Sequence, residues 1–149
     1  MTTTRQFCTF FLNQLFFGVE VDRVQEVIRY QSITPVPLAP AVVHGIINLR
    51  GQIVTAIDLR RLLELEALAD GQVPMNIVVR TQQDTFSLLV DRIGDVLTVT
   101  EDSFEKSPDM LAGIGRELIQ GAYKLPGSLL LILDVDKAVS SNILNRAVQ

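Results

Sequence analysis

Apolar and polar side chains alternate along most of this chain in short runs, the pattern of β-strands with one buried face. The first two runs, Phe7–Leu12 and Leu15–Glu20, flank Asn13-Gln14 and predict a hairpin. Many short strands separated by turns predict a mainly β fold, and the pattern fits a sandwich as well as a barrel. Five later runs predict further strands, with turns at residues 82–84 and at Pro126-Gly127: Met75–Thr81, Thr85–Asp91, Asp95–Thr100, Leu118–Tyr123 and Ser128–Asp134.

Three segments are predicted to be short helices. In Val21–Val27 the valines recur at helical spacing, with charged residues on the other side. Leu59–Leu65 predicts a second, brief helix. Val135–Asn145 predicts a closing helix, with Asp134 or Asp136 near its N-terminus, where the helix dipole favours a negative charge.

Loops are predicted between these elements. Ser32–Pro40 contains three prolines, which exclude a helix interior or a central strand and predict an extended connection. Ala67–Pro74 is predicted to be a surface loop, and the polar stretch Glu101–Gly115 to be the most mobile one. The chain shows neither a clear linker nor a strong internal repeat, and 149 residues is the length of one domain with a sizeable core.

The largely apolar run Val43–Leu63 is divided by a turn. Asn48 and Gly51 are turn-forming residues, so strands are predicted on both sides of them, the second ending at Asp58. Arg50 is then placed at or beside the hairpin tip, with its planar fork of donors facing outward. Folding does not require an arginine there. Arg50 therefore indicates binding to a carboxylate or carbonyl, against the alternative of a solvated turn charge.

Composition narrows the classes of function. The formal net charge of −4 argues against nonspecific binding to nucleic acid or to an anionic membrane. Cys8 is the only cysteine, which excludes an intrachain disulfide and fits a cytoplasmic protein. The apolar stretch Phe7–Val19 is interrupted by Asn13-Gln14, which favours strands over a signal peptide. No run reaches the roughly 18 apolar residues of a membrane-spanning helix.

Catalytic and metal-binding motifs are not evident in the sequence. His44 is interpreted as a strand-entry residue and Cys8 as a small, partly buried apolar residue. The chain lacks the clustered ligands of a zinc site, a complete phosphate-binding loop and a G-x-S-x-G nucleophile motif. Asp91 and Asp95 are interpreted as solvated turn carboxylates. No cofactor, metal or enzymatic activity is therefore expected.

One enzymatic alternative stays open at this level. A small enzyme could use a carboxylate as general base on a β scaffold, with Glu26 or Asp58 as the candidates. Such a carboxylate would need a raised pKa in a cleft.

Four segments carry a resemblance to a known family. The motif HGIINLRGQIVTAIDLR, from His44 to Arg60, resembles the signature of the CheW family of chemotaxis adaptor proteins. Three other segments resemble the same family: VDRVQEVIRYQSITPVPLAP, FSLLVDRIGDVLTV and IQGAYKLPGSLLLILDVDKAV. The resemblance extends from about Phe7 to Val139. Thr55 departs from it, since the family often has proline at that position.

The resemblance implies a fold and a function. The expected fold is one domain over residues 1–149, with two interwoven SH3-like five-stranded β-barrels, short helices and a C-terminal helix over about 135–145. The expected function is that of a non-enzymatic adaptor coupling chemoreceptors to a CheA-type histidine kinase. It would be cytoplasmic and recruited to membrane-associated receptor arrays. Its partners would be the kinase regulatory domain and the receptor's cytoplasmic tip, without nucleic acid or membrane insertion.

The resemblance also assigns roles to residues. The receptor-binding groove is expected to contain Arg50, Val24, Glu26 and Val27, and Gly45 is expected to influence coupling to the kinase. Alternatives stay open for these residues. The valines can be core, Glu26 can belong to a solvated face, and Gly45 can serve strand geometry alone.

Leu89 is a further candidate for the groove, on different grounds. It falls on the strand face opposite Phe86, Leu88 and Val90, so either the second barrel or a partner must cover it; the second barrel is favoured. An adaptor of a related pathway that controls pili or phototaxis would carry the same features. Self-association through apolar strands also stays open.

Overall fold

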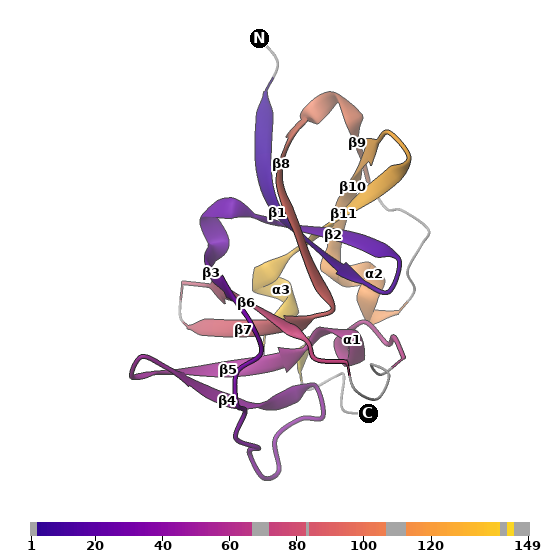
Figure 1. Cartoon of the computed structure of the whole chain (residues 1–149). Coiled ribbons are helices and arrows are strands. Elements are labelled where there is room, and N and C mark those ends of the chain that lie inside the picture. Colours follow the sequence, from indigo (N-terminus) through magenta and orange to yellow (C-terminus); the bar gives the residue numbers. More distant parts are fainter. Residues whose placement is uncertain (1–2, 67–71, 83, 107–112, 141–142, 145–149) are drawn as a thin grey trace.

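The protein folds into two mixed β-sheets with short helices (Figure 1). The structure is a computed structural model, and it describes residues 3–66, 72–82, 84–106, 113–140 and 143–144. One sheet has six strands in the order β8 (Arg92–Thr100), β1 (Thr4–Leu12), β2 (Leu15–Glu20), β11 (Ser128–Leu133), β10 (Ile119–Leu125) and β9 (Phe104–Glu105). The other has five strands in the order β3 (Val24–Ile28), β6 (Met75–Arg80), β7 (Thr85–Val90), β5 (Gln52–Asp58) and β4 (Val43–Leu49).

The mainly β class is confirmed, and each predicted strand is present with its bounds shifted by a few residues. The chain builds the hairpin β1–β2, then the whole five-stranded sheet, and then returns to complete the six-stranded sheet. Each sheet is antiparallel except for one parallel pair, β2–β11 in the first and β5–β7 in the second. The six-stranded sheet is therefore assembled from both ends of the chain, which interweaves the two halves.

The helix predicted over Val21–Val27 is wrong. Only Val21–Arg23 is helical, as a single 3₁₀ turn (η1), and β3 begins at Val24. Pairing with β6 supplies the backbone hydrogen bonds of this segment, and the β-branched valines favour a strand over a helix. A register shift between Val24 and Glu26 interrupts the pairing, and such a bulge breaks strict alternation. For this reason the spacing of the valines in the sequence resembled helical periodicity.

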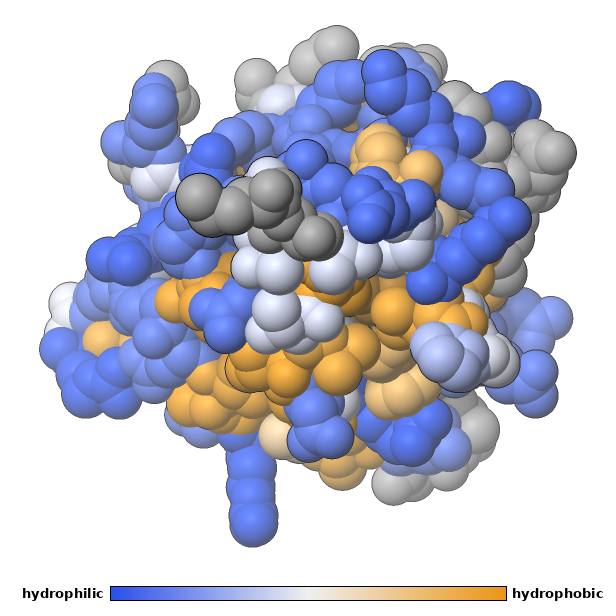
Figure 2. All heavy atoms as spheres, turned by 90° about the horizontal axis from the view of Figure 1, so that it is seen from above, coloured by the Kyte–Doolittle hydropathy of each residue, from blue (hydrophilic) through white to orange (hydrophobic). Residues whose placement is uncertain are grey.

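Three apolar clusters form the core. The largest lies between the two sheets and includes Phe10, Phe17, Ile57 and Leu88. A second, rich in aromatic rings, belongs to the six-stranded sheet and includes Phe7 and Tyr123, whose ring centroids are 5.6 Å apart. A third, aliphatic cluster belongs to the five-stranded sheet: Ile47, Leu49, Val54 and Val78. Some apolar surface remains exposed to solvent. Figure 2 shows apolar side chains gathered across the middle of one face and surrounded by hydrophilic ones.

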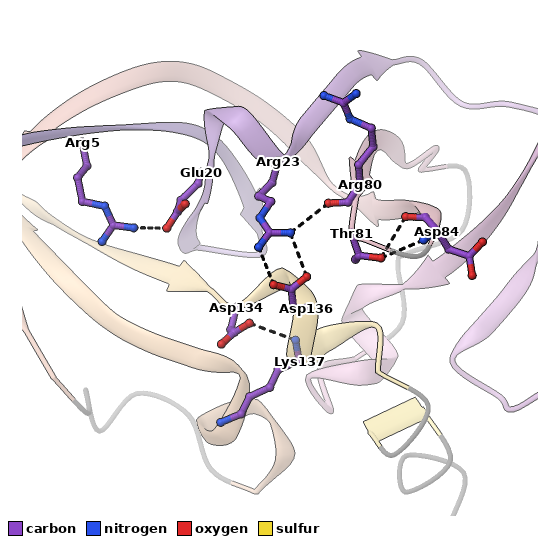
Figure 3. Close-up of polar contacts among 9 residues, drawn as sticks. All are labelled: Arg5, Glu20, Arg23, Arg80, Thr81, Asp84, Asp134, Asp136 and Lys137. Carbon is purple, nitrogen blue, oxygen red and sulfur yellow. Dashed lines mark hydrogen bonds and ion pairs between the residues drawn. The ribbon is translucent and has the colours of Figure 1, made fainter.

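A short helix follows the hairpin β4–β5 in one sheet and the hairpin β10–β11 in the other. Helix α1 (Leu59–Leu62) confirms the brief helix predicted after Asp58, whose side chain accepts a hydrogen bond from the Arg61 N–H at 3.1 Å. Helix α3 (Val135–Ala138) is capped in the same way by Asp134 (Figure 3). Helix α3 ends at Ala138, and Val139 and Ser140 are not helical, but Ile143 and Leu144 of the predicted Val135–Asn145 helix are helical again. Residues 141–142 and 145 lie outside the described residues.

The two long loops were predicted only in part. Residues 67–71 and 107–112 lie outside the described part of the chain, so the predicted mobility of Glu101–Gly115 stays a prediction. Within the second loop, Glu101–Ser103 form a 3₁₀ turn (η2) and the next two residues form β9. Helix α2 (Ile114–Leu118) was not predicted, because glycines at positions 113 and 115 indicated a loop.

The unit β4–β5–α1 recurs as β10–β11–α3. The strands of both hairpins pair with a shift of register just before a glycine, Gly45 in one and Gly121 in the other. Each hairpin turns at a glycine with positive φ, and each is followed by an aspartate that caps a helix. The two units align without a gap from Val43 and Ile119 onward. Few residues are identical, so the repeat is evident only from strand register.

Candidate functional site

The tip of the β4–β5 hairpin presents Arg50 to solvent. Leu49 and Gln52 form the last strand pair, so the loop has two residues, Arg50 and Gly51. Both have positive φ, 52° and 89°, as a type I′ turn requires. The Asn48 side chain fixes the turn by accepting a hydrogen bond from the Gly51 N–H at 2.9 Å. The predicted hairpin tip is confirmed, and the Arg50 side chain is 70% exposed.

Glu26 is the partner of the Arg50 side chain. Nη2 of Arg50 donates to Oε2 of Glu26, which joins the hairpin tip to β3. Because β3 and β4 are the first and last strands of the five-stranded sheet, this ion pair links its two edges. The hydrogen bond from Arg50 lowers the pKa of Glu26, against a smaller desolvation that raises it. Glu26 is therefore ionised at neutral pH and orients Arg50.

Val24 and Val27 flank Glu26 on β3 in different surroundings. Val24 is half-buried and packs against the main core, which agrees with its interpretation as a core residue. Val27 is exposed. The edge strand β3 therefore carries the exposed Val27 and, as the residue before it, the Glu26 that pairs with Arg50 of the hairpin tip.

Leu89 lies in another place, the wall of a groove of about 700 Å³. Leu88 and Val90 belong to the main core and Phe86 packs against it, so the predicted opposite orientation of Leu89 is confirmed. The described residues that line the groove include Tyr30, Val43, His44 and Asp58, but neither Arg50 nor Glu26. The predicted groove residues therefore occupy two separate locations.

Gly45 is buried where the connection after β3 crosses β4. Thr34 and Ile46 exchange two backbone hydrogen bonds of 2.9 Å at this crossing. A Cβ at Gly45 would lie 2.4 Å from the Thr34 carbonyl oxygen and 2.5 Å from Cγ2 of Ile33. Glycine is therefore required for the chain to close the open side of the five-stranded sheet. The structure supports the geometric interpretation of Gly45.

Arg60 is a buried charged residue that the sequence analysis did not single out. Its Nε and Nη2 donate to the two carboxylate oxygens of Asp91 at 2.7 and 2.5 Å, a bidentate pair. Arg60 also donates to the Glu66 carbonyl and to the side chain of Asn13 in the β1–β2 turn. The network ties α1 and the end of β7 to the six-stranded sheet. Local sequence does not distinguish the buried Arg60 from the exposed Arg61 beside it.

The interpretation of Asp91 as a solvated carboxylate is wrong. Partial burial alone would raise its pKa, but hydrogen bonds from Arg60 and from the Asn13 N–H outweigh this, and the pKa of Asp91 is lowered. The same pairing raises the pKa of Arg60. The pair is therefore ionised throughout the neutral range and acts as a joint between the sheets.

The two carboxylates of the enzymatic alternative have other roles. Asp58 caps α1, and Glu26 has a lowered pKa, the opposite of what a general base near neutral pH requires. Among the described residues, no group of three or more His, Cys, Asp and Glu side chains is arranged to hold a metal ion. The helices of the described chain are all too short to cross a bilayer.

The fold and this site define a small β scaffold built for binding, and comparisons with known proteins identify its family. The model of the CheW-like domain matches residues 6–142, so the chain belongs to the CheW-like family. This confirms the resemblance and places the chain in a class of non-enzymatic chemotaxis scaffolds.

Individual relatives agree with the family match. The chemotaxis protein CheW of Treponema pallidum is 31% identical over 95% of this chain and 85% of its own length. CheW of Thermotoga maritima is 31% identical over 88% of this chain and 85% of its own length. The crystal structure of the scaffolding protein TtCheW from Thermoanaerobacter tengcongensis has a TM-score of 0.78 at 27% identity, covering 88% of this chain and 89% of that chain.

Proposed function

We propose that this scaffold holds a CheA-type histidine kinase and the cytoplasmic tip of a chemoreceptor in one complex at membrane-associated arrays. One observation carries the receptor contact: a two-residue turn presents Arg50 to solvent, where it pairs with Glu26 of the edge strand β3. An exposed arginine that is held by one carboxylate is suited to a protein surface that offers a further hydrogen-bond acceptor.

Arg50 can bind the receptor without giving up its present partner. Among the described residues, Glu26 is the one hydrogen-bond partner of the Arg50 guanidinium, through a single nitrogen. The remaining N–H groups face solvent and can donate to a receptor carboxylate or carbonyl. Because Glu26 already fixes the guanidinium, less side-chain entropy is lost on binding. Val27 would add apolar contact, and Val24 would support the strand from the core side.

Leu89 and Gly45 have different places in this proposal. The groove lined by Leu89 would accept apolar side chains of the receptor helices away from the ion pair. Gly45 would act on kinase coupling indirectly, because it keeps the five-stranded sheet closed and is itself buried.

The test is Arg50→Ala, with Glu26→Gln as the matched variant. Arg50→Ala should change the free energy of unfolding by no more than about 1 kcal/mol, because the ion pair is exposed on the arginine side. It should weaken binding of a soluble receptor-tip fragment by about tenfold, since a charge-assisted hydrogen bond is lost. Glu26→Gln keeps the size of the side chain and should have a smaller effect.

Titration against the isolated kinase regulatory domain is the control. Equal losses of kinase and receptor binding in Arg50→Ala would contradict a separate receptor surface. A folded wild-type chain that binds neither partner would overturn the proposed function itself.

A further inference from the structure

The groove lined by Leu89 has a counterpart in the six-stranded sheet. The parallel pairs β5–β7 and β2–β11 have the same register, which makes Glu20 the counterpart of Leu89. The unit β10–β11–α3 supplies counterparts of three further groove residues, His44, Asp58 and Arg60; they are Gln120, Asp134 and Asp136. These four counterparts line one small hollow, and Figure 3 shows three of them, Glu20, Asp134 and Asp136.

The two places differ greatly in size. The groove beside α1 has a volume of about 700 Å³, whereas the hollow beside α3 has a volume of about 40 Å³. Charged side chains occupy the smaller place, because Glu20 pairs with Arg5, and Arg23 pairs with Asp136. In the larger place the counterpart of Glu20 is the uncharged Leu89. The same arrangement of strands and helix can therefore be nearly filled, so the open groove is a property of its side chains and not a consequence of the fold.

Apolar side chains form much of the wall of the groove. Leu89 and Val90 are buried there, whereas Tyr30 and Val73 are 43% and 63% exposed. A partner that covers Tyr30 and Val73 gains free energy from the burial of apolar surface. An amphipathic helix that lays its apolar face in a groove is a common way to bury such a surface.

The charges in the groove favour an acidic partner. Asp91 is paired with the buried Arg60, and Asp58 accepts a hydrogen bond from the backbone N–H of Arg61. The two carboxylates among the described lining residues are therefore engaged. In contrast, the exposed guanidinium of Arg61 has no hydrogen-bond or ion-pair partner within the part of the chain that the structure describes. A partner can pair with this charge, and a planar guanidinium matches a carboxylate.

We propose that the groove binds an acidic amphipathic helix of the receptor tip, with an apolar side chain against Tyr30 and Leu89 and a carboxylate on Arg61. This inference rests on the proposed function, and it makes Arg61 a specificity-determining residue. The groove lies at the far end of the β4–β5 hairpin from Arg50, since β5 runs from the tip to Asp58 over seven residues, roughly 23 Å. The contact at Arg61 is therefore separate from the contact at Arg50.

The experiment is a calorimetric titration of the full chain with a soluble receptor-tip fragment. Arg61→Glu reverses the free charge and should weaken binding tenfold or more, because two carboxylates would then face each other. Arg61→Lys keeps the charge without the planar fork and should lose about threefold. Arg80→Glu is the matched control, because Arg80 is exposed and lies six residues of β6 beyond Pro74 of the groove, roughly 20 Å away. It makes the same change in net charge and should leave binding within about twofold of the wild type.

Two further measurements test the apolar contact and the matching charge on the receptor. Tyr30→Ala removes a partly exposed ring, so Tm should change little while receptor binding weakens about fivefold. Receptor fragments in which each acidic residue is changed in turn to lysine supply the complementary test. One of these fragments should bind Arg61→Glu more tightly than it binds the wild-type chain.

The outcomes separate the two proposals. Unchanged receptor binding in Arg61→Glu overturns the carboxylate contact, unchanged binding in Tyr30→Ala overturns the apolar contact, and both results leave the proposed function standing. Equal weakening by Arg61→Glu and Arg80→Glu overturns the contact at Arg61, because long-range attraction would then be the cause. Loss of kinase binding with intact receptor binding also overturns it, because the groove would then belong to the kinase. A wild-type chain that does not bind the receptor fragment overturns the proposed function, and the groove contact with it.

Discussion

The units β4–β5–α1 and β10–β11–α3 have the same backbone arrangement but different side chains. Both place a glycine where another segment crosses the first strand: Gly45 under Thr34, and Gly121 under Phe104 and Glu105 of β9. Both end in a capping aspartate. At the tips, however, Arg50-Gly51 stands where the other unit has Pro126-Gly127. The shared residues are those that the backbone requires, and the differing residue is the one proposed to bind.

The hairpins β6–β7 and β1–β2 extend the comparison into the core. Phe86 lies opposite Thr55, as Phe17 lies opposite Leu131, which fixes the correspondence of the two hairpins. In this register Asn76 corresponds to Phe7. The six-stranded sheet thus contains an aromatic ring where the five-stranded sheet contains an amide. The sheet that carries the proposed receptor surface has the smaller, more polar interior.

The largest expected difference in stability is between the ion pairs of helices α1 and α3. Arg60 of α1 corresponds to Asp136 of α3, and both make bidentate pairs, Arg60 with Asp91 and Asp136 with Arg23 (Figure 3). Arg60 is buried, so Arg60→Ala should lower the free energy of unfolding by about 3–5 kcal/mol because Asp91 is left unpaired. Asp136 is exposed, so Asp136→Ala should cost less than about 1 kcal/mol. Urea denaturation measures both, and similar losses would contradict the difference in burial.

Substitution of the two glycines that another segment packs against, Gly45 and Gly121, should give the next largest loss of stability. Gly45→Ala places a Cβ 2.4 Å from a backbone oxygen and should cost about 2–3 kcal/mol. Gly121→Ala meets the end of the Phe104 ring, which can move, and the Glu105 carbonyl at 2.6 Å. We expect a somewhat smaller loss there. Thermal unfolding of both variants checks the order, and a harmless Gly45→Ala would show that the crossing is not tight.

The buried polar pair inside the five-stranded sheet, Ser87 and Asn76, should contribute less to the free energy of unfolding than the two glycines do. Ser87 donates to Oδ1 of Asn76 at 2.7 Å, and the Asn76 amide donates to the Arg29 carbonyl. Ser87→Ala should cost about 1–3 kcal/mol, because a buried acceptor loses its donor. Adding Asn76→Ala should cost less than the sum of the single changes, which a double-mutant cycle measures. Strict additivity would mean that the two side chains do not act as a pair.

The smallest expected effect is the decrease in the free energy of unfolding at acid pH. The pKa of Asp91 is lowered in the folded protein, so its pairing contributes stability that is fully present above the unfolded value near 3.8 and is lost as pH falls through the folded value. Unfolding free energies measured between pH 5 and pH 2 should therefore fall. Asp91→Asn, which cannot ionise, should show a weaker dependence on pH. An unchanged dependence would show that other carboxylates cause it.

Local sequence predicted most strands, because alternation and turn residues such as Asn48 and Gly51 act within a few positions. It failed at Val24–Ile28, where a bulge at an edge strand produced helical spacing. It also failed at Asp91, because solvent exposure of a turn carboxylate depends on what packs against it. Among the candidate site residues, Arg50 was placed correctly, whereas its partner Glu26 belongs to a strand distant in sequence.

The sequence by itself determined the β class, the hairpin tip at Arg50, the family and the need for small residues at particular turns. These follow from side-chain pattern and from the φ angles that glycine permits. Only the tertiary structure decided that Arg50 pairs with Glu26, that Arg60 joins the two sheets, and that Leu89 lies apart from the ion pair. Each of these depends on contacts between segments far apart in the chain, or on their absence, and burial and charge pairing arise only when those segments meet.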